Sequence, residues 1–165
     1  MADTLSIPLN ATREGIYISL VPQIESLVEG ENDFIANVSN IMAALHQAFG
    51  FLWVGCYFVK NDELVLGPFQ GPVACTRIKK GKGVCGTAWQ KNETIVVADV
   101  EQFPGHIACS SFSKSEIVVP LRNSKQEIVG VLDVDSTELN HFSSTDSIHL
   151  ERIASFIGKL LERID

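Results

Sequence analysis

The apolar residues of this chain change their spacing at Gly50, and that change constrains the fold more than any other feature. From Phe34 to Phe49 they recur at helical spacing, and Gly50 is a typical helix end. The next run, Phe51 to Val59, is aromatic and β-branched, and Asn61-Asp62 separates it from a similar run at Leu64 to Phe69. The pattern predicts a long helix followed by a β-hairpin.

A second hairpin and a last helix are predicted near the end of the chain. The strands are Glu116 to Leu121 and Glu127 to Val134, joined by a turn at residues 123–125. Ser143 or Ser144 can cap the helix that follows, whose apolar residues form one stripe. Because hairpins imply an antiparallel sheet, we expect the α+β class.

The N-terminal region gives weaker signals. Residues 1–12 are interpreted as a weakly ordered lead-in, and Pro22 is expected to open a helix that Gly30 ends. This helix and the last one both carry apolar stripes, so we expect them to pack together on one face of the sheet. The other face is left to residues 70–115.

Residues 70–115 are predicted to cover a pocket. We expect short strands at Val73 to Ile78 and Thr94 to Ala98, and a short helix at Cys85 to Gln90. Residues 99–115 follow neither period, and loops of that length in a compact domain are usually functional or disordered. A pocket between this cover and the sheet is the expected ligand site.

Length and composition indicate one domain over residues 1–165, with 45% apolar residues and a net charge of −7. This acidic balance argues against nucleic-acid binding. The one basic cluster is Arg77, Lys79, Lys80 and Lys82. We see neither a secretory leader nor a long apolar run that could enter a membrane, so the expected location is the cytoplasm.

That compartment keeps thiols reduced, so the four cysteines are expected to be buried, metal-binding or catalytic rather than paired in structural disulfides. Cys56 lies within the first predicted strand and is interpreted as a buried structural residue. Cys75, Cys85 and Cys109 lie in or beside the predicted cover, where loops commonly display reactive groups. Zinc is the competing interpretation, but structural zinc sites use cysteine pairs about two to four residues apart, and His106-x-x-Cys109 has no matching second half. We therefore expect no metal.

Three cysteines around one cavity favour a thiol enzyme that reduces an oxidised small molecule. The attacking cysteine must be a thiolate, so its pKa must fall below the free value of about 8.5. The basic cluster and the Gly-rich turn at residues 83–86 can supply positive charge. A sulfenic acid on one cysteine then condenses with a second thiol, and an external dithiol opens the resulting disulfide.

Carboxylates are predicted to face the same pocket. Asp133 and Asp135 alternate at the end of a strand and so project to one face, and Glu116 opens the neighbouring strand. Three carboxylates near a pocket can bind an ammonium group and supply a proton to a leaving oxygen. Trp53 and Tyr57 share a face of the first strand; on spacing alone they fit the core better than a pocket wall.

Six motifs, taken in order, indicate a family. They lie at residues 66–71 (LGPFQG), 74–78 (ACTRI), 81–86 (GKGVCG), 99–100 with 103–109 (DV and FPGHIAC), 115–118 (SEIV) and 131–136 (VLDVDS). Together they resemble the free methionine-(R)-sulfoxide reductases, which are built on a single GAF domain, from about residue 31 to the end. The resemblance implies a central antiparallel sheet with N- and C-terminal helices on one face, and loops with a short helix covering a pocket on the other.

The resemblance also implies roles for the cysteines. Cys109 would be the attacking thiolate, Cys75 the resolving thiol, and Cys85 a second partner or relay. The assignment of the nucleophile between Cys85 and Cys109 stays open. Thioredoxin would be the external reductant, with no metal or organic cofactor. We would expect an acidic residue directly after Cys109, where this chain has Ser110.

The implied substrate is free methionine sulfoxide of the R configuration. Glu116, Asp133 and Asp135 would hold its amino group and protonate the sulfoxide oxygen. Trp53 and Tyr57 would line the pocket at the thioether end. The carboxylates favour an ammonium group, which methionine within a polypeptide lacks.

Two other functions compete with this interpretation. One is a ligand-binding GAF sensor, which binds without consuming reductant. The other is a cysteine redox switch or peroxidase, against which the acidic positions argue because a peroxide offers no ammonium group. The expected partners are a small molecule and thioredoxin, with no nucleic acid and no membrane. GAF domains often pair through their terminal helices, so a homodimer is one expectation.

Overall fold

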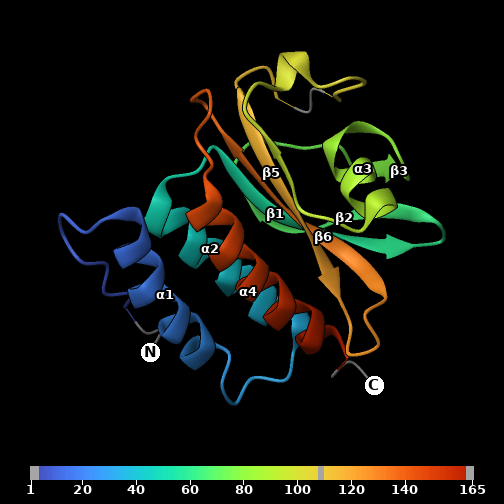
Figure 1. Ribbon diagram of the computed structural model, residues 1–165. Coiled ribbons are helices and arrows are strands. Elements are labelled where there is room, and N and C mark those ends of the chain that lie inside the picture. Colours follow the sequence, from blue (N-terminus) through green and yellow to red (C-terminus); the bar gives the residue numbers. More distant parts are fainter. Residues whose placement is uncertain (1–3, 108–109, 163–165) are drawn as a thin grey trace.

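The computed structural model describes residues 4–107 and 110–162 (Figure 1). The elements in chain order are α1 (Arg13–Leu27), α2 (Phe34–Phe49), β1 (Trp53–Lys60), β2 (Glu63–Gln70), β3 (Arg77–Lys79), α3 (Gly83–Lys91), β4 (Ile95–Val97), the 3-10 turn η1 (Val100–Gln102), β5 (Ser115–Arg122), β6 (Ile128–Ser136) and α4 (Ser144–Leu161). None of the described helices is long and apolar enough to cross a membrane.

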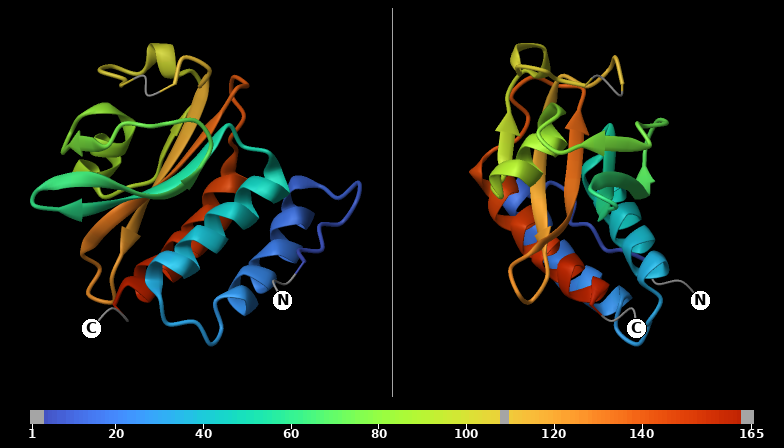
Figure 2. Two further views of the ribbon diagram at one scale, coloured as in Figure 1. Left: turned by 180° about the vertical axis from the view of Figure 1, so that it is seen from behind. Right: turned by 90° about the vertical axis from the view of Figure 1, so that its right-hand side faces the viewer.

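The six strands form one sheet in the order β3-β2-β1-β6-β5-β4, and every pairing is antiparallel. This confirms the α+β class and both predicted hairpins. α2 and α4 lie against one face of the sheet, and α1 packs on the outside of these two helices (Figure 2). α3 and the segments around it cover the other face (Figure 1).

Alternation along the central strands divides their side chains between two environments. On β6, Leu132 and Val134 join the helix-side core, whereas Asp133 and Asp135 line the opposite face. Cys56 on β1 belongs to the helix-side core and is fully buried, as its position in the sequence predicted. Desolvation by burial is the main reason why the pKa of the Cys56 thiol lies far above its usual value.

Local sequence signals mark three helix ends, two of which, Gly50 and Ser143, were predicted. Asp33 caps α2 by accepting a hydrogen bond from the backbone N–H of Ala36 at 2.8 Å, and Gly50 ends that helix in the left-handed conformation. Ser143 and Asp146 form a capping box at the start of α4. Each of these three ends therefore has a side-chain or glycine signal that is visible in the sequence.

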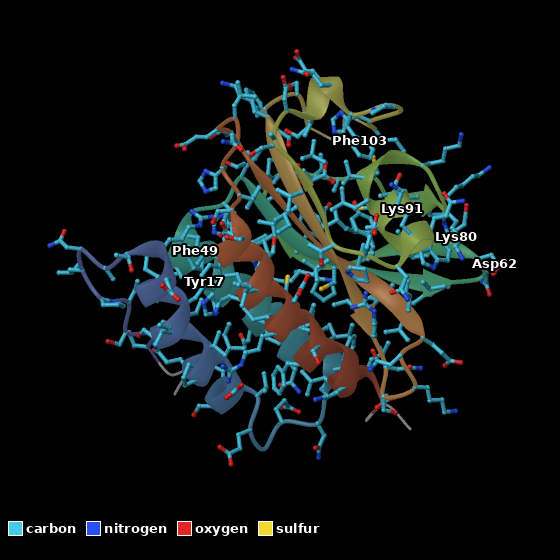
Figure 3. All side chains as sticks on the ribbon, in the orientation of Figure 1. Tyr17, Phe49, Asp62, Lys80, Lys91 and Phe103 are labelled. Carbon is cyan, nitrogen blue, oxygen red and sulfur yellow. The ribbon has the colours of Figure 1, made fainter. Side chains whose placement is uncertain are left out.

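The expectation that Pro22 opens the first helix is wrong. α1 begins after Thr12, whose hydroxyl accepts a hydrogen bond from Gly15 N–H at 3.1 Å, and Pro22 lies inside the helix. An interior proline removes one helical hydrogen bond and crowds the preceding turn. Burial of a face that includes Tyr17 and Ile24 against the rest of the core outweighs that cost. Tyr17 packs on Phe49 with ring centroids 4.3 Å apart (Figure 3).

Residues 4–12 contain no helix or strand, yet they contact the core. Leu5 and Ile7 pack against the helix-side cluster, and the backbone N–H of Ser6 donates to the Gln23 side chain at 2.7 Å. The lead-in is therefore attached to α1 over its described part.

The cover differs from expectation in one detail. A strand was predicted at Val73 to Ile78, but β3 begins only at Arg77 and pairs with the start of β2. The predicted short helix is confirmed as α3, and β4 lies within the predicted strand at residues 94–98. Residues 99–107 and 110–114 are irregular, as predicted, apart from η1.

Candidate active site

A pocket that is partly open to solvent lies between the sheet and its cover. Its floor comes from β1, β5 and β6, and its walls come from α3 and from the loops on either side of it. The lining residues are Trp53, Tyr57, Val73, Ala74, Ile78, Lys82, Gly83, Val84, Cys85, His106, Ile107, Ser110, Ser113, Glu116, Asp133 and Asp135. All three carboxylates predicted from the sequence, and one of the three cover cysteines, are therefore together.

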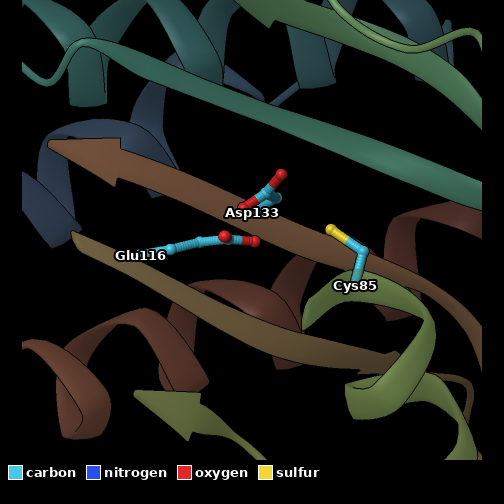
Figure 4. A group of neighbouring side chains, drawn as sticks. All are labelled: Cys85, Glu116 and Asp133. Atoms are coloured by element: carbon cyan, nitrogen blue, oxygen red, sulfur yellow. The ribbon is translucent and has the colours of Figure 1, made fainter. Parts of the chain in front are cut away.

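Strand register brings the three carboxylates together. Glu116 on β5 pairs with Asp135 on β6, and Asp133 follows two residues away on the same face. Oxygen atoms of Glu116 and Asp133 and the sulfur of Cys85 all lie within 4.8 Å of one another (Figure 4). The described part of the chain thus holds a dense, buried group of acids beside a cysteine here.

Burial makes these acids hard to ionise. Desolvation is the largest cause that raises the pKa of Glu116 well above its usual value, and the charges of Asp133 and Asp135 add to it. The pKa of Asp133 is also raised well above its usual value, first by desolvation and then by Asp135. Oδ1 of Asp133 is buried and has no hydrogen-bond partner among the described residues. The site therefore holds protons readily and would gain from a cationic ligand.

Asp135 is less strongly affected. Desolvation raises its pKa to about 6, and a hydrogen bond from the Ser113 hydroxyl opposes the rise. Ser113 comes from the loop before β5, so this loop takes part in setting the charge of the pocket.

Cys85 lies in the first turn of α3 and is 4% exposed. Desolvation, followed by the charges of Asp133 and Glu116, raises the pKa of its thiol well above the usual value. The expected activation by neighbouring cations is therefore wrong for this cysteine. Sequence neighbours suggested positive charge, whereas the neighbours in space are acids.

Most of the basic cluster lies away from the pocket. Lys82 is its one member in the lining. Arg77 pairs with Glu63 at 3.2 Å on the sheet surface, and Lys80 lies 5.1 Å from the centre of the Trp89 ring, at the outer side of α3 (Figure 3). The cluster mostly serves the surface around β3 and α3.

Trp53 and Tyr57 belong both to the core and to the lining of the pocket. They are 4% and 1% exposed, they line the pocket, and their rings stack with centroids 5.9 Å apart. Gly55 between them is required, because a Cβ there would lie 2.3 Å from the Trp53 ring. Trp53 Nε1 donates to the carbonyl of Pro72 at 3.1 Å, and the Tyr57 hydroxyl donates to that of Cys75 at 3.0 Å. These two side chains thus anchor the segment that carries Cys75.

The remaining cysteines differ in their location and in their bonding. Cys75 is half-buried in the loop after β2 and is disulfide-bonded. Cys109, the residue predicted to be the nucleophile, lies outside the described residues. Cys56 and Cys85 are the free thiols among the described residues, and they lie on opposite faces of the sheet.

Sequence reasoning did not identify all the polar groups of the pocket. Ser113 contacts Asp135, and His106 Nε2 lies 3.8 Å from Glu116 Oε2. Burial lowers the pKa of His106, which favours a neutral imidazole. A lone serine in a loop has no spacing signal, and the only pattern that includes His106 is half of a zinc site. Ser110, at the position where an acid was expected, also lines the pocket.

Comparison with known proteins agrees with this geometry. The model of the GAF domain family matches residues 33–161, so fold and sequence define a GAF-domain protein. The chain is 56% identical to GAF domain-containing protein A of Dictyostelium discoideum, over 95% of this chain and 99% of that one. It is 43% identical to the free methionine-R-sulfoxide reductase of Escherichia coli, over 90% of each.

A solved structure gives the same result. The free methionine-R-sulfoxide reductase of Neisseria meningitidis, in complex with its substrate, matches with a TM-score of 0.91 and 49% identity over 97% of both chains. The chain therefore belongs to the free methionine-R-sulfoxide reductase family of GAF-domain proteins.

Proposed function

We propose that this protein reduces free methionine-R-sulfoxide to methionine by thiol chemistry. One observation carries the proposal: three acids and a cysteine converge in one buried pocket that contains no compensating side-chain cation at its floor among the described residues. An ammonium group would supply the missing positive charge. The relatives named above carry this activity in their names.

The acids have two tasks in this proposal. The ionised members accept hydrogen bonds from the substrate ammonium, and the unpartnered Oδ1 of Asp133 is the best placed acceptor. A member that holds its proton donates it to the sulfoxide oxygen, a role that the raised pKa of Glu116 favours. Methionine within a polypeptide has no ammonium group, so it loses the first of these interactions.

The thiol steps conserve atoms and electrons. The Cys109 thiolate attacks the sulfoxide sulfur, and oxygen is transferred to the cysteine, giving methionine and a sulfenic acid. The Cys75 thiol then attacks that sulfenic sulfur, releasing water and forming a disulfide. Cys85 is a poor choice for the first step, because burial and two acids disfavour its thiolate. Its role as a second partner or relay remains part of the proposal.

An external dithiol must reduce the disulfide and is itself oxidised to a disulfide. We propose thioredoxin for this step and the cytoplasm as the location, since that compartment keeps thiols reduced. A homodimer through the terminal helices stays a prediction.

The substrate and the external reductant are tested in two separate experiments. Methionine formation is first measured with a synthetic dithiol, comparing free R-sulfoxide, free S-sulfoxide and N-acetylated R-sulfoxide. Turnover restricted to the free R form supports the proposal, and equal turnover on the acetylated form contradicts the ammonium site. NADPH consumption with thioredoxin and its reductase then tests the partner. Binding of the R-sulfoxide without turnover would instead favour a sensor.

A further inference from the structure

The floor of the pocket has the composition of a metal site. Cys85 offers a sulfur and Glu116 and Asp133 offer oxygens, with the three ligand atoms within 4.8 Å of one another (Figure 4). We propose that in the reduced protein these three side chains bind a thiophilic divalent cation, Zn²⁺ in particular, with water in the fourth position.

The spacing is compatible with tetrahedral coordination. At the usual Zn–S and Zn–O lengths, neighbouring ligand atoms lie roughly 3.4 to 3.6 Å apart. The side chains would therefore move together by about 1 Å at most. They come from α3, β5 and β6, so rigid elements hold all three (Figure 4).

A second observation points to an absent ligand. Asp133 is 7% exposed, lies in this cluster, and leaves Oδ1 buried without a hydrogen-bond partner among the described residues. A buried polar atom of this kind costs free energy unless something binds it. A dication would also balance the negative charge of these two carboxylates, which desolvation and then Asp135 disfavour.

The mixed donor set selects the metal. Sulfur with two carboxylate oxygens suits Zn²⁺ and Co²⁺, whereas Mg²⁺ and Ca²⁺ prefer oxygen ligands alone. Binding must expel the thiol proton of Cys85 and any proton on the two carboxyls to solvent, so affinity should rise with pH. If the proposed function is correct, the cation occupies the ammonium site and inhibits turnover; this consequence rests on that function, but the binding itself does not.

The binding experiment uses the full chain, reduced with a phosphine because dithiols chelate zinc. Co²⁺ is titrated first, since thiolate ligation gives a sulfur-to-cobalt charge-transfer band, and Zn²⁺ is then used to displace it. We expect one cation per chain, no displacement of cobalt by Mg²⁺, and loss of the band in Cys85→Ser. In Glu116→Gln we expect affinity to fall roughly tenfold or more.

The control asks whether the other cysteines bind the metal instead. The double variant Cys75→Ser/Cys109→Ser should keep the band, because all three proposed ligands remain. A band that survives in Cys85→Ser, or disappears in the double variant, would mean that another cysteine supplies the sulfur and would overturn the proposal. Absence of a band in the folded wild-type protein would overturn it too. If Cys85→Ser fails to fold, Glu116→Gln/Asp133→Asn replaces it, with the same expected loss.

Discussion

Two buried aspartates illustrate how this protein uses negative charge. Asp146, on the helix side, accepts hydrogen bonds from the Arg13 guanidinium at 2.5 Å, the Tyr17 hydroxyl at 2.9 Å and the Ser143 backbone at 2.8 Å. Asp133, on the pocket side, has an oxygen with no partner among the described residues. The two residues are 0% and 7% exposed, so burial alone does not distinguish them.

Their pKa values move in opposite directions. Burial would raise the pKa of Asp146, but the Ser143 N–H, Arg13 and Tyr17 outweigh it and lower the value. Burial and Asp135 raise the pKa of Asp133. A charge whose partners are built into the fold stabilises the fold. A charge left without them costs stability and is available to a ligand.

Among the acids, the largest expected effect on stability is at Asp146. Asp146→Asn leaves the Arg13 guanidinium without its charge partner and should lower the free energy of unfolding by about 3 kcal/mol, the lower end for broken buried pairs because Arg13 is partly exposed. Urea denaturation at pH 7 measures this, with Asp133→Asn as the matched control. A loss of less than about 1 kcal/mol in the free energy of unfolding, or an equal loss in Asp133→Asn, would contradict the contrast between Asp146 and Asp133.

Replacing Asp135 should raise the free energy of unfolding by an amount similar to the loss at Asp146. Its folded pKa of about 6 exceeds the usual 3.8, so below pH 3.8 both states hold the proton. Between these values the unfolded chain releases a proton that the folded chain keeps, and stability falls as pH rises. Above pH 6 the cost is complete, about 3 kcal/mol at 1.36 kcal/mol per pH unit.

Asp135→Asn removes that cost while keeping an oxygen for Ser113. We expect the variant to be up to about 3 kcal/mol more stable than wild type at pH 7.5, with no gain at pH 3.5. Urea denaturation across this range measures the difference. Asp146→Asn should behave oppositely, since the lowered pKa of Asp146 contributes stability that is lost as pH falls. A gain at Asp135 that does not vary with pH would contradict this account.

The effect on activity should appear at Asp133. Asp133→Asn removes an ionic hydrogen-bond acceptor for the substrate ammonium, worth about 1.5 to 3 kcal/mol. The kcat/KM for free methionine-R-sulfoxide should therefore fall roughly 10- to 150-fold, with stability unchanged or raised. Leu132→Ala, one residue away on the helix side, should have the opposite profile. It should cost about 2 to 5 kcal/mol of stability and have little effect on kcat/KM. If Asp133→Asn and Leu132→Ala change kcat/KM and stability in the same way, the two faces of β6 do not have separate roles.

Much of this division could be predicted from the sequence. The period-2 alternation along β6 places Asp133 and Asp135 on one face, and hairpin pairing brings Glu116 beside them. Cys56, inside a strand of apolar residues, was placed correctly in the core. These inferences succeeded because they depend on local geometry repeated over several residues.

The failures have a common physical cause. Pro22 breaks a helix by local rules, but contacts with distant elements decide its position inside α1. The charge around Cys85 was inferred from its sequence neighbours, whereas strands β5 and β6 supply its actual surroundings. Ser113 was missed because a single loop serine becomes significant only when the fold brings it to Asp135.

Ser113 also provides the smallest and most specific test of how the pocket side regulates its charge. The hydroxyl stabilises ionised Asp135, so Ser113→Ala should raise the pKa of that carboxyl above 6 and lower the free energy of unfolding by about 1 kcal/mol at pH 8. At pH 5 the carboxyl already holds its proton in the folded state, and the loss should be smaller. Ser110→Ala is the matched control, because Ser110 lines the same pocket but accepts its hydrogen bond from Phe112 N–H at 3.2 Å. A loss in Ser113→Ala that is equal at both pH values, or equal to that of the control, would mean that the serine supports only the loop.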